Sequence, residues 1–202
     1  MKKGNLIVIS APSGCGKGTI IARLMKNDAN LFYSVSATTR GKREGEIDGK
    51  NYYFISKDEF KNLIEEDGVL EYAEYVGNFY GTPKKAVFDK LDEGRDVILE
   101  IEVKGALQIK EKCPDAVMIF IIPPSIDELN RRLVGRNTES IEVITQRVLK
   151  AKEEIPLCKE YDYVVVNDRL EDAVADIESI IKSEKLKFKN MKEIISEVVE
   201  KC

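Results

Sequence analysis

A glycine-rich segment with one lysine lies near the start of the chain, between an apolar run at 6–9 and a helical pattern. Glycines let the backbone approach a phosphate closely, and the positive end of the following helix adds to the attraction. Lys17 would reach the terminal phosphates of a nucleoside triphosphate as a point charge. The order strand, loop, helix predicts a phosphate-binding loop (P-loop) made of Ala11, Pro12, Ser13, Gly14, Cys15, Gly16, Lys17, Gly18 and Thr19.

Two positions of this loop depart from the usual pattern. Ala11 stands where the first glycine is common, and Gly18 stands where a Ser or Thr hydroxyl would bind Mg²⁺, with Thr19 one place later. We therefore expect the Mg²⁺ that accompanies ATP to be held mainly through water and phosphate. Cys15 has two interpretations: a reactive thiol, whose pKa the helix N-terminus lowers, or a small residue that fits the loop.

A second set of phosphate-binding side chains follows the loop. Arg40 and Arg43 carry planar guanidinium groups suited to a phosphate dianion, and Tyr52 and Tyr80 add hydroxyl donors. Two arginines alone would indicate a solvated basic loop. Beside a P-loop and two tyrosines, they indicate a separate site for a phosphorylated acceptor.

Motifs along most of the chain resemble the guanylate kinase family, whose members phosphorylate GMP and dGMP with MgATP. The resemblance extends over residues 4–181 and is specific, because several motifs recur in order and at compatible spacing. Besides the P-loop, it rests on residues 34–46, 49–54, 70–72, 78–82, 99–102, 123–125, 132–136 and 166–168.

The resemblance implies how the acceptor is recognised. Guanine presents N1–H and N2–H₂ donors on one edge and the O6 and N7 acceptors on another. Glu71 would accept from the donors, and Ser36 and Thr82 would lie near the acceptors. Thr82, just before Pro83, also fits as the N-cap of the next helix, and both roles stay open. The implied GMP site comprises Ser36, Arg40, Arg43, Tyr52, Glu71, Tyr80, Thr82 and Glu102.

Carboxylates and arginines complete the implied reaction centre. Glu100 and Glu102 end a strand pattern, where ligands gather in parallel sheets; the alternative is a pair of surface carboxylates. The resemblance places Glu100 near hydrated Mg²⁺ and Glu102 near the guanine amine. Asn167 follows a strand and either borders the adenine of ATP or stabilises a loop. Cations that stabilise transferring phosphate would be Lys17, Arg40, Arg132, Arg136 and Arg147.

The elements that must position these residues alternate between strand and helix. Apolar runs at 6–9, 97–99, 117–122 and 164–166 predict buried parallel strands, and 32–36 predicts another. Helical patterns between them predict an α/β P-loop kinase fold with a central parallel sheet flanked by helices. We expect one domain over 1–202: a core at 1–35, 83–125 and 160–202, an α+β GMP-binding insertion at 36–82, and a helical lid at 126–159. The apolar stripe near Ile194 and Val198, in the tail 182–202, is expected to pack on the core, with packing on a partner as the alternative.

Composition limits the other function classes. The 202 residues carry a formal net charge of −4, which argues against a nucleic-acid binder, and no apolar run is long enough to span a membrane. The chain has no histidine, and its four cysteines form no Cys-x-x-Cys pair, so the usual zinc sites are not expected. We expect a cytoplasmic protein with free thiols, and the sequence leaves the oligomeric state open.

Three alternatives compete with this interpretation. Another nucleoside-monophosphate kinase is possible because Lys17-Gly18-Thr19 also occurs in adenylate kinases, although Glu71 favours GMP. A non-catalytic guanylate-kinase-like scaffold module typically has a degraded phosphate loop, and the loop here is intact. A signalling GTPase would not need a separate acceptor-phosphate cluster.

Overall fold

A five-stranded parallel sheet forms the centre of the molecule in the computed structural model, which describes residues 3–135 and 140–200. The strand order is β2-β7-β1-β8-β9, and every neighbouring pair is parallel. The strands span β1 (Leu6–Ser10), β2 (Leu31–Tyr33), β7 (Asp96–Glu100), β8 (Val117–Ile122) and β9 (Tyr163–Val166). The predicted fold class is confirmed, and the strand expected at 32–36 is shorter and begins one residue earlier.

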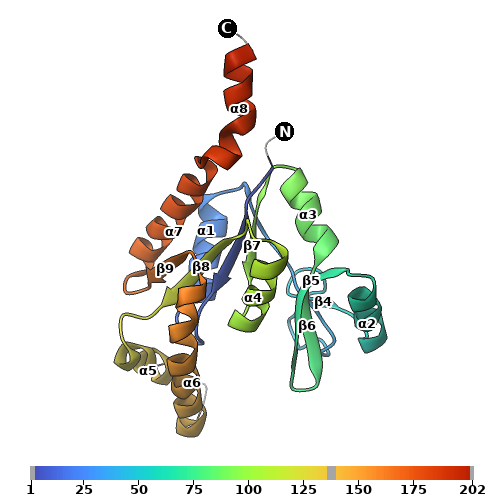
Figure 1. The fold of residues 1–202 in the computed structure, drawn as a ribbon. Coiled ribbons are helices and arrows are strands. Elements are labelled where there is room, and N and C mark those ends of the chain that lie inside the picture. Colours follow the sequence, from blue (N-terminus) through green and yellow to red (C-terminus); the bar gives the residue numbers. More distant parts are fainter. Residues whose placement is uncertain (1–2, 136–139, 201–202) are drawn as a thin grey trace.

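Helices cover both faces of this sheet, which is why its strands are apolar on both sides (Figure 1). Ile7 and Ile9 of β1 belong to one hydrophobic cluster, whereas Leu6 and Val8 belong to the other. Full burial of one such side chain contributes roughly 1.5–3 kcal/mol to stability. The first cluster includes residues of α1 (Lys17–Asn27) and α7 (Leu170–Lys185), and the second includes residues of α3 (Lys84–Asp92) and α4 (Val103–Lys112).

A smaller sheet with one helix is inserted between β2 and α3. Its strand order is β4-β3-β6-β5, with β3–β4 parallel and the other pairs antiparallel. Ser56 and Glu59 form a reciprocal capping box at the start of the helix. The elements are β3 (Ala37–Thr38), β4 (Tyr53–Phe54), α2 (Lys57–Glu65), β5 (Val69–Tyr75) and β6 (Asn78–Pro83).

The segment expected to form a lid is helical over its described residues. It contains α5 (Ile126–Val134), α6 (Ile141–Glu154) and the 3-10 helix η1 (Ile155–Glu160). Ser125 caps α5 by accepting from the amide of Glu128, but the Glu128 side chain bonds Arg131 and Arg132. Helices α5 and α6 and the insertion lie beyond the carboxyl ends of the central strands, and both ends of the chain lie on the opposite side (Figure 1).

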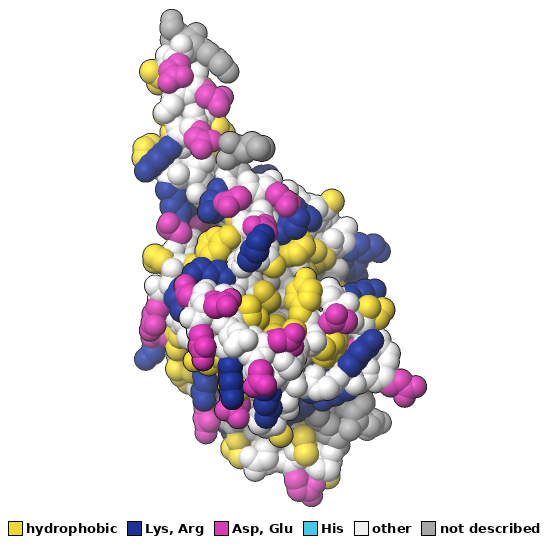
Figure 2. Space-filling view, turned by 90° about the vertical axis from the view of Figure 1, so that its right-hand side faces the viewer, with side chains coloured by type: hydrophobic (Ala, Val, Ile, Leu, Met, Phe, Trp, Pro, Cys, Tyr) yellow, Lys and Arg dark blue, Asp and Glu magenta, His cyan; other side chains and the backbone are white. Residues whose placement is uncertain are grey.

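The C-terminal helix α8 (Phe188–Glu200) stands out from the body of the molecule (Figure 2). None of its residues is buried, and Val198 and Val199 are 61% and 70% exposed. The expectation that the tail's apolar stripe packs on the core is therefore wrong. The sequence of α8 is amphipathic, but the helix points away from the body of the protein, and none of its residues belongs to either hydrophobic cluster.

Candidate active site

The phosphate loop joins β1 to α1 and has the backbone that its glycines allow. Gly14 and Gly16 have φ of 92° and 84°, a left-handed conformation that disfavours other residues. A Cβ on Gly16 would lie only 2.6 Å from Nδ2 of Asn167, so this position also needs glycine for space. Lys17 begins α1, and 17% of its side chain is exposed.

Lys17 lies where it can meet phosphate. Its Nζ is 4.0 Å from Oε1 of Glu100, at the carboxyl end of the neighbouring strand β7. Burial lowers the pKa of Lys17, and the negative charges of Glu100, Glu102 and Glu154 oppose that shift. Because burial outweighs the effect of these carboxylates, an anionic ligand beside Lys17 would further stabilise its charged form.

A cavity of about 350 Å³ surrounds this lysine. All nine predicted loop residues, 11–19, line it, together with Glu100 and Glu102. The structure thus brings the predicted ATP-phosphate residues together at one end of the sheet, as a P-loop requires.

Asn167 and two of the lid arginines contact the loop or its surroundings. Asn167 donates a 2.7 Å hydrogen bond from Nδ2 to the carbonyl of Cys15, so its amide stabilises the loop. Arg132 is held by Oε1 of Glu128 and by the carbonyl of Asn167, at 2.7 and 2.8 Å. Nη1 of Arg147 lies 3.2 Å from the Ser13 hydroxyl. Arg136, the remaining predicted lid arginine, lies outside the described residues.

Glu71 and Thr82 meet in the interior of the insertion. The Thr82 hydroxyl donates a 2.7 Å hydrogen bond to Oε1 of Glu71, and the two side chains are buried. Burial raises the pKa of Glu71, and the hydrogen bonds from Thr82 and the charge of Lys112 oppose the shift. The N-cap role left open for Thr82 is not observed, because β6 continues to Pro83 and Pro83 is the N-cap of α3.

A second cavity, of about 750 Å³, extends from Glu71 toward the phosphate loop. Predicted acceptor residues Ser36, Tyr52 and Tyr80 line it, with Glu71 and Glu102. Five residues line both cavities: Glu100, Glu102, Val103, Lys150 and Glu154. The two cavities therefore adjoin at the carboxyl end of β7.

The sequence analysis did not identify Lys150 and Glu154 of α6 as residues of the site. Lys150 lies 3.5 Å from Oε2 of Glu102 and 3.3 Å from Oε1 of Glu154. Burial acts to lower the pKa of Lys150, but the two carboxylates raise it overall. Lys150 follows Arg147 by three residues, a spacing that puts both on one helix face and could have drawn attention to it.

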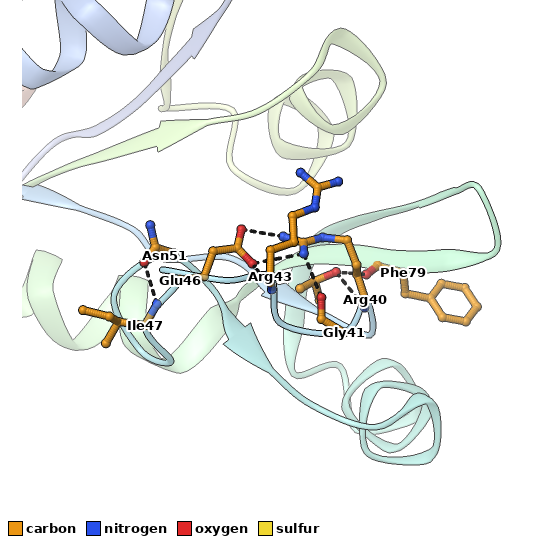
Figure 3. A network of polar contacts seen from close by, with 8 residues as sticks. Arg40, Gly41, Arg43, Glu46, Ile47, Asn51 and Phe79 are labelled. Atoms are coloured by element: carbon orange, nitrogen blue, oxygen red, sulfur yellow. Dashed lines mark hydrogen bonds and ion pairs between the residues drawn. The ribbon is translucent and has the colours of Figure 1, made fainter.

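Arg40 and Arg43 lie in one loop around the carboxylate of Glu46 (Figure 3). Nη1 and Nη2 of Arg40 donate to Oε2 and Oε1 of Glu46, at 3.0 and 2.8 Å, and the amide of Arg43 donates to Oε2. These bonds lower the pKa of Glu46. The Arg43 guanidinium points away from this pair (Figure 3). Sequence reasoning missed Glu46, although its charge within the arginine motif was a signal.

Tyr52 and Tyr80 connect the loop that carries Arg40 with the second cavity. The rings of Tyr52 and Tyr80 meet edge to face with centroids 6.0 Å apart, and the Arg40 guanidinium lies 5.5 Å from the Tyr52 ring. Burial, followed by the neighbouring Tyr80, raises the pKa of Tyr52, so its hydroxyl stays a donor. Tyr52 and Tyr80 therefore line the cavity and Arg40 lies behind Tyr52, whereas neither Arg40 nor Arg43 lines the cavity itself.

The surroundings of Glu100 fit a hydrated Mg²⁺. Its Oε1 is 3.9 Å from the position that a Cβ on Gly18 would occupy, so both residues face the same space beside the loop. Oε2 accepts from the Tyr33 hydroxyl at 3.1 Å, which orients the carboxylate. Among residues 3–135 and 140–200, no group of three acidic, histidine or cysteine side chains is placed to bind a metal. One carboxylate with substrate phosphates is a common arrangement for Mg²⁺.

A P-loop cavity that adjoins a second cavity lined by the expected acceptor residues is the architecture of a nucleoside-monophosphate kinase. A profile of the guanylate kinase family matches residues 3–184, and the chain belongs to that family. It is 57% identical to guanylate kinase from Lactococcus lactis over 183 residues, covering 91% of this chain and 89% of that one. It is 52% identical to guanylate kinase from Halalkalibacterium halodurans over 199 residues, covering 98% of each chain.

Structural comparison agrees. The crystal structure of guanylate kinase from Anaplasma phagocytophilum superposes with a TM-score of 0.74 at 38% identity, covering 93% of this chain and 89% of that one. No helix in the part of the chain that the structure describes is long and apolar enough to cross a membrane.

Proposed function

We propose that the chain transfers the γ-phosphoryl group of MgATP to the phosphate of GMP, giving ADP and GDP. The observation that carries this proposal is the wall shared by the two cavities, formed in part by Glu100 and Lys150. A phosphate oxygen of GMP attacks the γ-phosphorus while the bond from that phosphorus to the β-phosphate oxygen of ATP breaks. Because the two substrates would bind in adjoining sites, their reaction becomes effectively unimolecular, which accounts for much of the catalysis.

On the donor side, the backbone of residues 11–19 binds the ATP phosphates and Lys17 neutralises charge on the β- and γ-phosphates. The burial that lowers the pKa of Lys17 supports this role, since a bound triphosphate would supply negative charge that stabilises the ammonium form. We assign Asn167 to the loop rather than to direct base recognition, because its amide bonds Cys15. Arg147 lies beside Ser13 and is the described lid arginine best placed to reach the transferring group.

On the acceptor side, Arg40, Arg43, Tyr52 and Tyr80 bind the GMP phosphate. Arg40 would exchange its bidentate contact with Glu46 for the phosphate or share it between the two. Glu71 accepts from guanine N1–H and N2–H₂, with its orientation set by Thr82.

Ser36 serves O6 and N7 of the guanine and Glu102 lies near its amine, whereas Thr82, whose single hydroxyl proton is donated to Glu71, acts through that carboxylate. None of the proposed contacts uses the ribose 2′-hydroxyl, so we expect dGMP to be an acceptor too.

The lid brings cations over the reacting phosphates when it closes. Residues 126–159 include Arg132, Arg136 and Arg147, and closure would exclude water and limit hydrolysis of ATP. Arg132 is bound to Glu128 and to the carbonyls of Asn167 and Asp168, so its first role is to hold the lid against the loop.

Mg²⁺ arrives with ATP and would be held through water by Glu100, with no direct hydroxyl ligand at Gly18. When bound, the ion neutralises phosphate charge and orients the oxygens. We place the reaction in the cytoplasm, as part of purine nucleotide metabolism; the free thiols of Cys15, Cys113 and Cys158 support that compartment.

The experiment is ADP release from MgATP with GMP, AMP, CMP and UMP as separate acceptors. Strong turnover with GMP alone is expected. Turnover with a different nucleotide would overturn the acceptor site, and binding of GMP without turnover would favour a scaffold module. Lys17→Ala should abolish turnover in a folded protein, and near-normal activity of that variant would exclude the proposed ATP site.

A further inference from the structure

We propose that one face of α4, formed by Gly105 and Gln108, positions Glu71 for the guanine base and thereby contributes to acceptor selectivity. The proposal rests on the proposed function, since it concerns the base cavity of the GMP site. It assigns a positioning role to Gln108, which does not line the second cavity, and to Gly105, which lines it and lies against the Glu71 carboxylate.

The first observation is that β5, the strand that carries Glu71, is an edge strand with an interrupted ladder. β5 pairs only with β6 in its four-stranded sheet. The register between the two strands shifts between Val69 and Tyr72, so regular pairing is lost around Glu71. Such an irregularity re-aims a side chain but leaves the local backbone less constrained.

The second observation is that Gln108 restores the missing constraint from the outer side. Its Nε2 donates to the carbonyl of Tyr72 at 2.9 Å, and its Oε1 accepts from the amide of Tyr72 at 3.2 Å. The carboxamide thus pairs with both backbone groups of one residue, as a neighbouring strand would. Because Tyr72 directly follows Glu71, these bonds fix the backbone that aims the carboxylate.

The third observation is that Gly105 provides the surface against which the Glu71 carboxylate rests. A Cβ on Gly105 would lie 2.5 Å from Oε2 and 3.1 Å from Cδ of Glu71. No side chain fits there unless the carboxylate moves. Thr82 bonds Oε1 and Gly105 limits the space beside Oε2, so the two together define the carboxylate's position.

Helix α4 connects the contacts of Gly105 and Gln108 with the reaction centre. Gly105 and Gln108 are three apart and share a face, and Lys112 continues that face with a 3.4 Å contact to the carbonyl of Val69. The N-cap of α4 is Glu102, two residues after Glu100 at the end of β7. Helix α4 therefore connects the base-recognition carboxylate with the wall shared by the two cavities.

The test uses Gln108→Met, which keeps the length of the side chain but removes both hydrogen bonds, with Lys182→Met on the exposed surface of α7 as the control. Steady-state constants are measured for GMP, for MgATP and for inosine monophosphate, which lacks the N2 amine. We expect KM for GMP to rise about tenfold and the preference for GMP over inosine monophosphate to fall several-fold, with KM for MgATP within about twofold.

Gly105→Ala separates positioning from fold stability. Alanine favours a helix over glycine, and the nearest clash is with the movable end of Glu71, so the thermal midpoint should stay near that of the native protein. GMP affinity, measured by calorimetric titration, should still fall about tenfold or more, with MgATP affinity unchanged.

The native protein serves as the reference, so a lack of GMP turnover there would refute the proposed function rather than this inference. Unchanged GMP affinity and selectivity in both folded variants would overturn the inference. An equal loss for GMP and MgATP, accompanied by a lower thermal midpoint, would also overturn it by showing a purely structural role. If Gln108→Met does not fold, Gly105→Ala and Gln108→Glu decide the question by the same titrations.

Discussion

The side-chain amide of Asn167 donates a 2.7 Å hydrogen bond to the carbonyl of Cys15, joining the end of β9 to the phosphate loop. The carbonyl of Asn167 in turn accepts from Nη1 of Arg132, on α5, at 2.8 Å. Asn167 thus links the core, the phosphate loop and helix α5. The absence of a side chain on Gly16 makes the contact possible, since a Cβ there would lie 2.6 Å from the Asn167 amide.

Replacing this amide by a carboxylate should weaken ATP binding selectively. In Asn167→Asp, a negative oxygen would face the Cys15 carbonyl, so a 2.7 Å hydrogen bond becomes a repulsion. We expect KM for MgATP to rise about tenfold or more, because a lost buried hydrogen bond costs roughly 1–3 kcal/mol. KM for GMP should change by less than about threefold. Asn62→Asp, at an exposed position of α2, is the control, and an unaltered KM for MgATP in Asn167→Asp would contradict the bracing role.

The hydroxyl group of Thr82 should contribute more to GMP affinity than its methyl group does. Thr82→Val keeps the shape but leaves Oε1 of Glu71 without its 2.7 Å donor. Hydrogen bonds to charged groups contribute roughly 1.5–3 kcal/mol, so GMP affinity should fall about 10–100-fold. Thr82→Ser keeps the donor and should bind GMP within a few-fold of the native protein. Calorimetric titration checks both variants, and equal affinity of the Val and Ser variants would show that the hydroxyl does not orient Glu71.

Glu71 should make GMP binding depend on pH in a range above that of an ordinary carboxyl group. Burial raises its pKa from the ordinary 4.5. The ionised form accepts from guanine, so GMP affinity should fall as the pH decreases through this raised pKa. The phosphate of GMP also titrates, so the comparison is with Glu71→Gln, whose weaker binding should lack this component. If both proteins show the same pH profile of GMP affinity, Glu71 is not the titrating acceptor.

The raised pKa of Glu71 also predicts how the free energy of unfolding changes with pH. The folded state holds the Glu71 proton more tightly than the unfolded state, because the folded pKa is the higher. The stabilising effect of the protonated form is fully present below the unfolded pKa and is lost as the pH rises through the folded pKa. Glu71→Gln removes this loss, so its thermal midpoint at pH 7 should equal or exceed that of the native protein. A lower midpoint at pH 7, with no such deficit at pH 4.5, would reverse the predicted sign.

The central sheet and the phosphate loop could be predicted because their signals are local. Buried runs such as 117–122 and the glycine spacing around Lys17 depend on the chain's own geometry. Thr82 shows the limit of such signals. The dipeptide Thr82-Pro83 fits an N-cap, but the buried carboxylate of Glu71 recruits the hydroxyl, and that competition is visible only when β5 and β6 pair.

The contacts that residues make with distant neighbours could not be predicted from the sequence. Gln108 lies 36 positions from Tyr72, and its role depends on an interrupted strand edge beside α4. Lys150 reaches Glu102 from the lid across the shared cavity wall. The stripe around Val198 predicted an amphipathic helix correctly but contains no information on what the helix contacts. Periodicity determines which face is apolar, whereas tertiary packing determines whether that face is covered.

Cys15 should be chemically inert in the folded protein. It lies in the phosphate loop with 1% exposure, and burial raises the pKa of its thiol to about 12, although Arg132 and Lys17 act to lower it. At pH 8 only about one thiol in 10⁴ would then be ionised, and the thiolate is the reactive form. We expect iodoacetamide to modify Cys15 at least about 100-fold more slowly in the native protein than in urea, as followed by peptide mass spectrometry. Cys15→Ala should keep GMP turnover within a few-fold, since the residue fills space rather than reacts. Native-state labelling as fast as that of the unfolded chain would instead establish the alternative left open by the sequence, a thiol activated by the helix N-terminus.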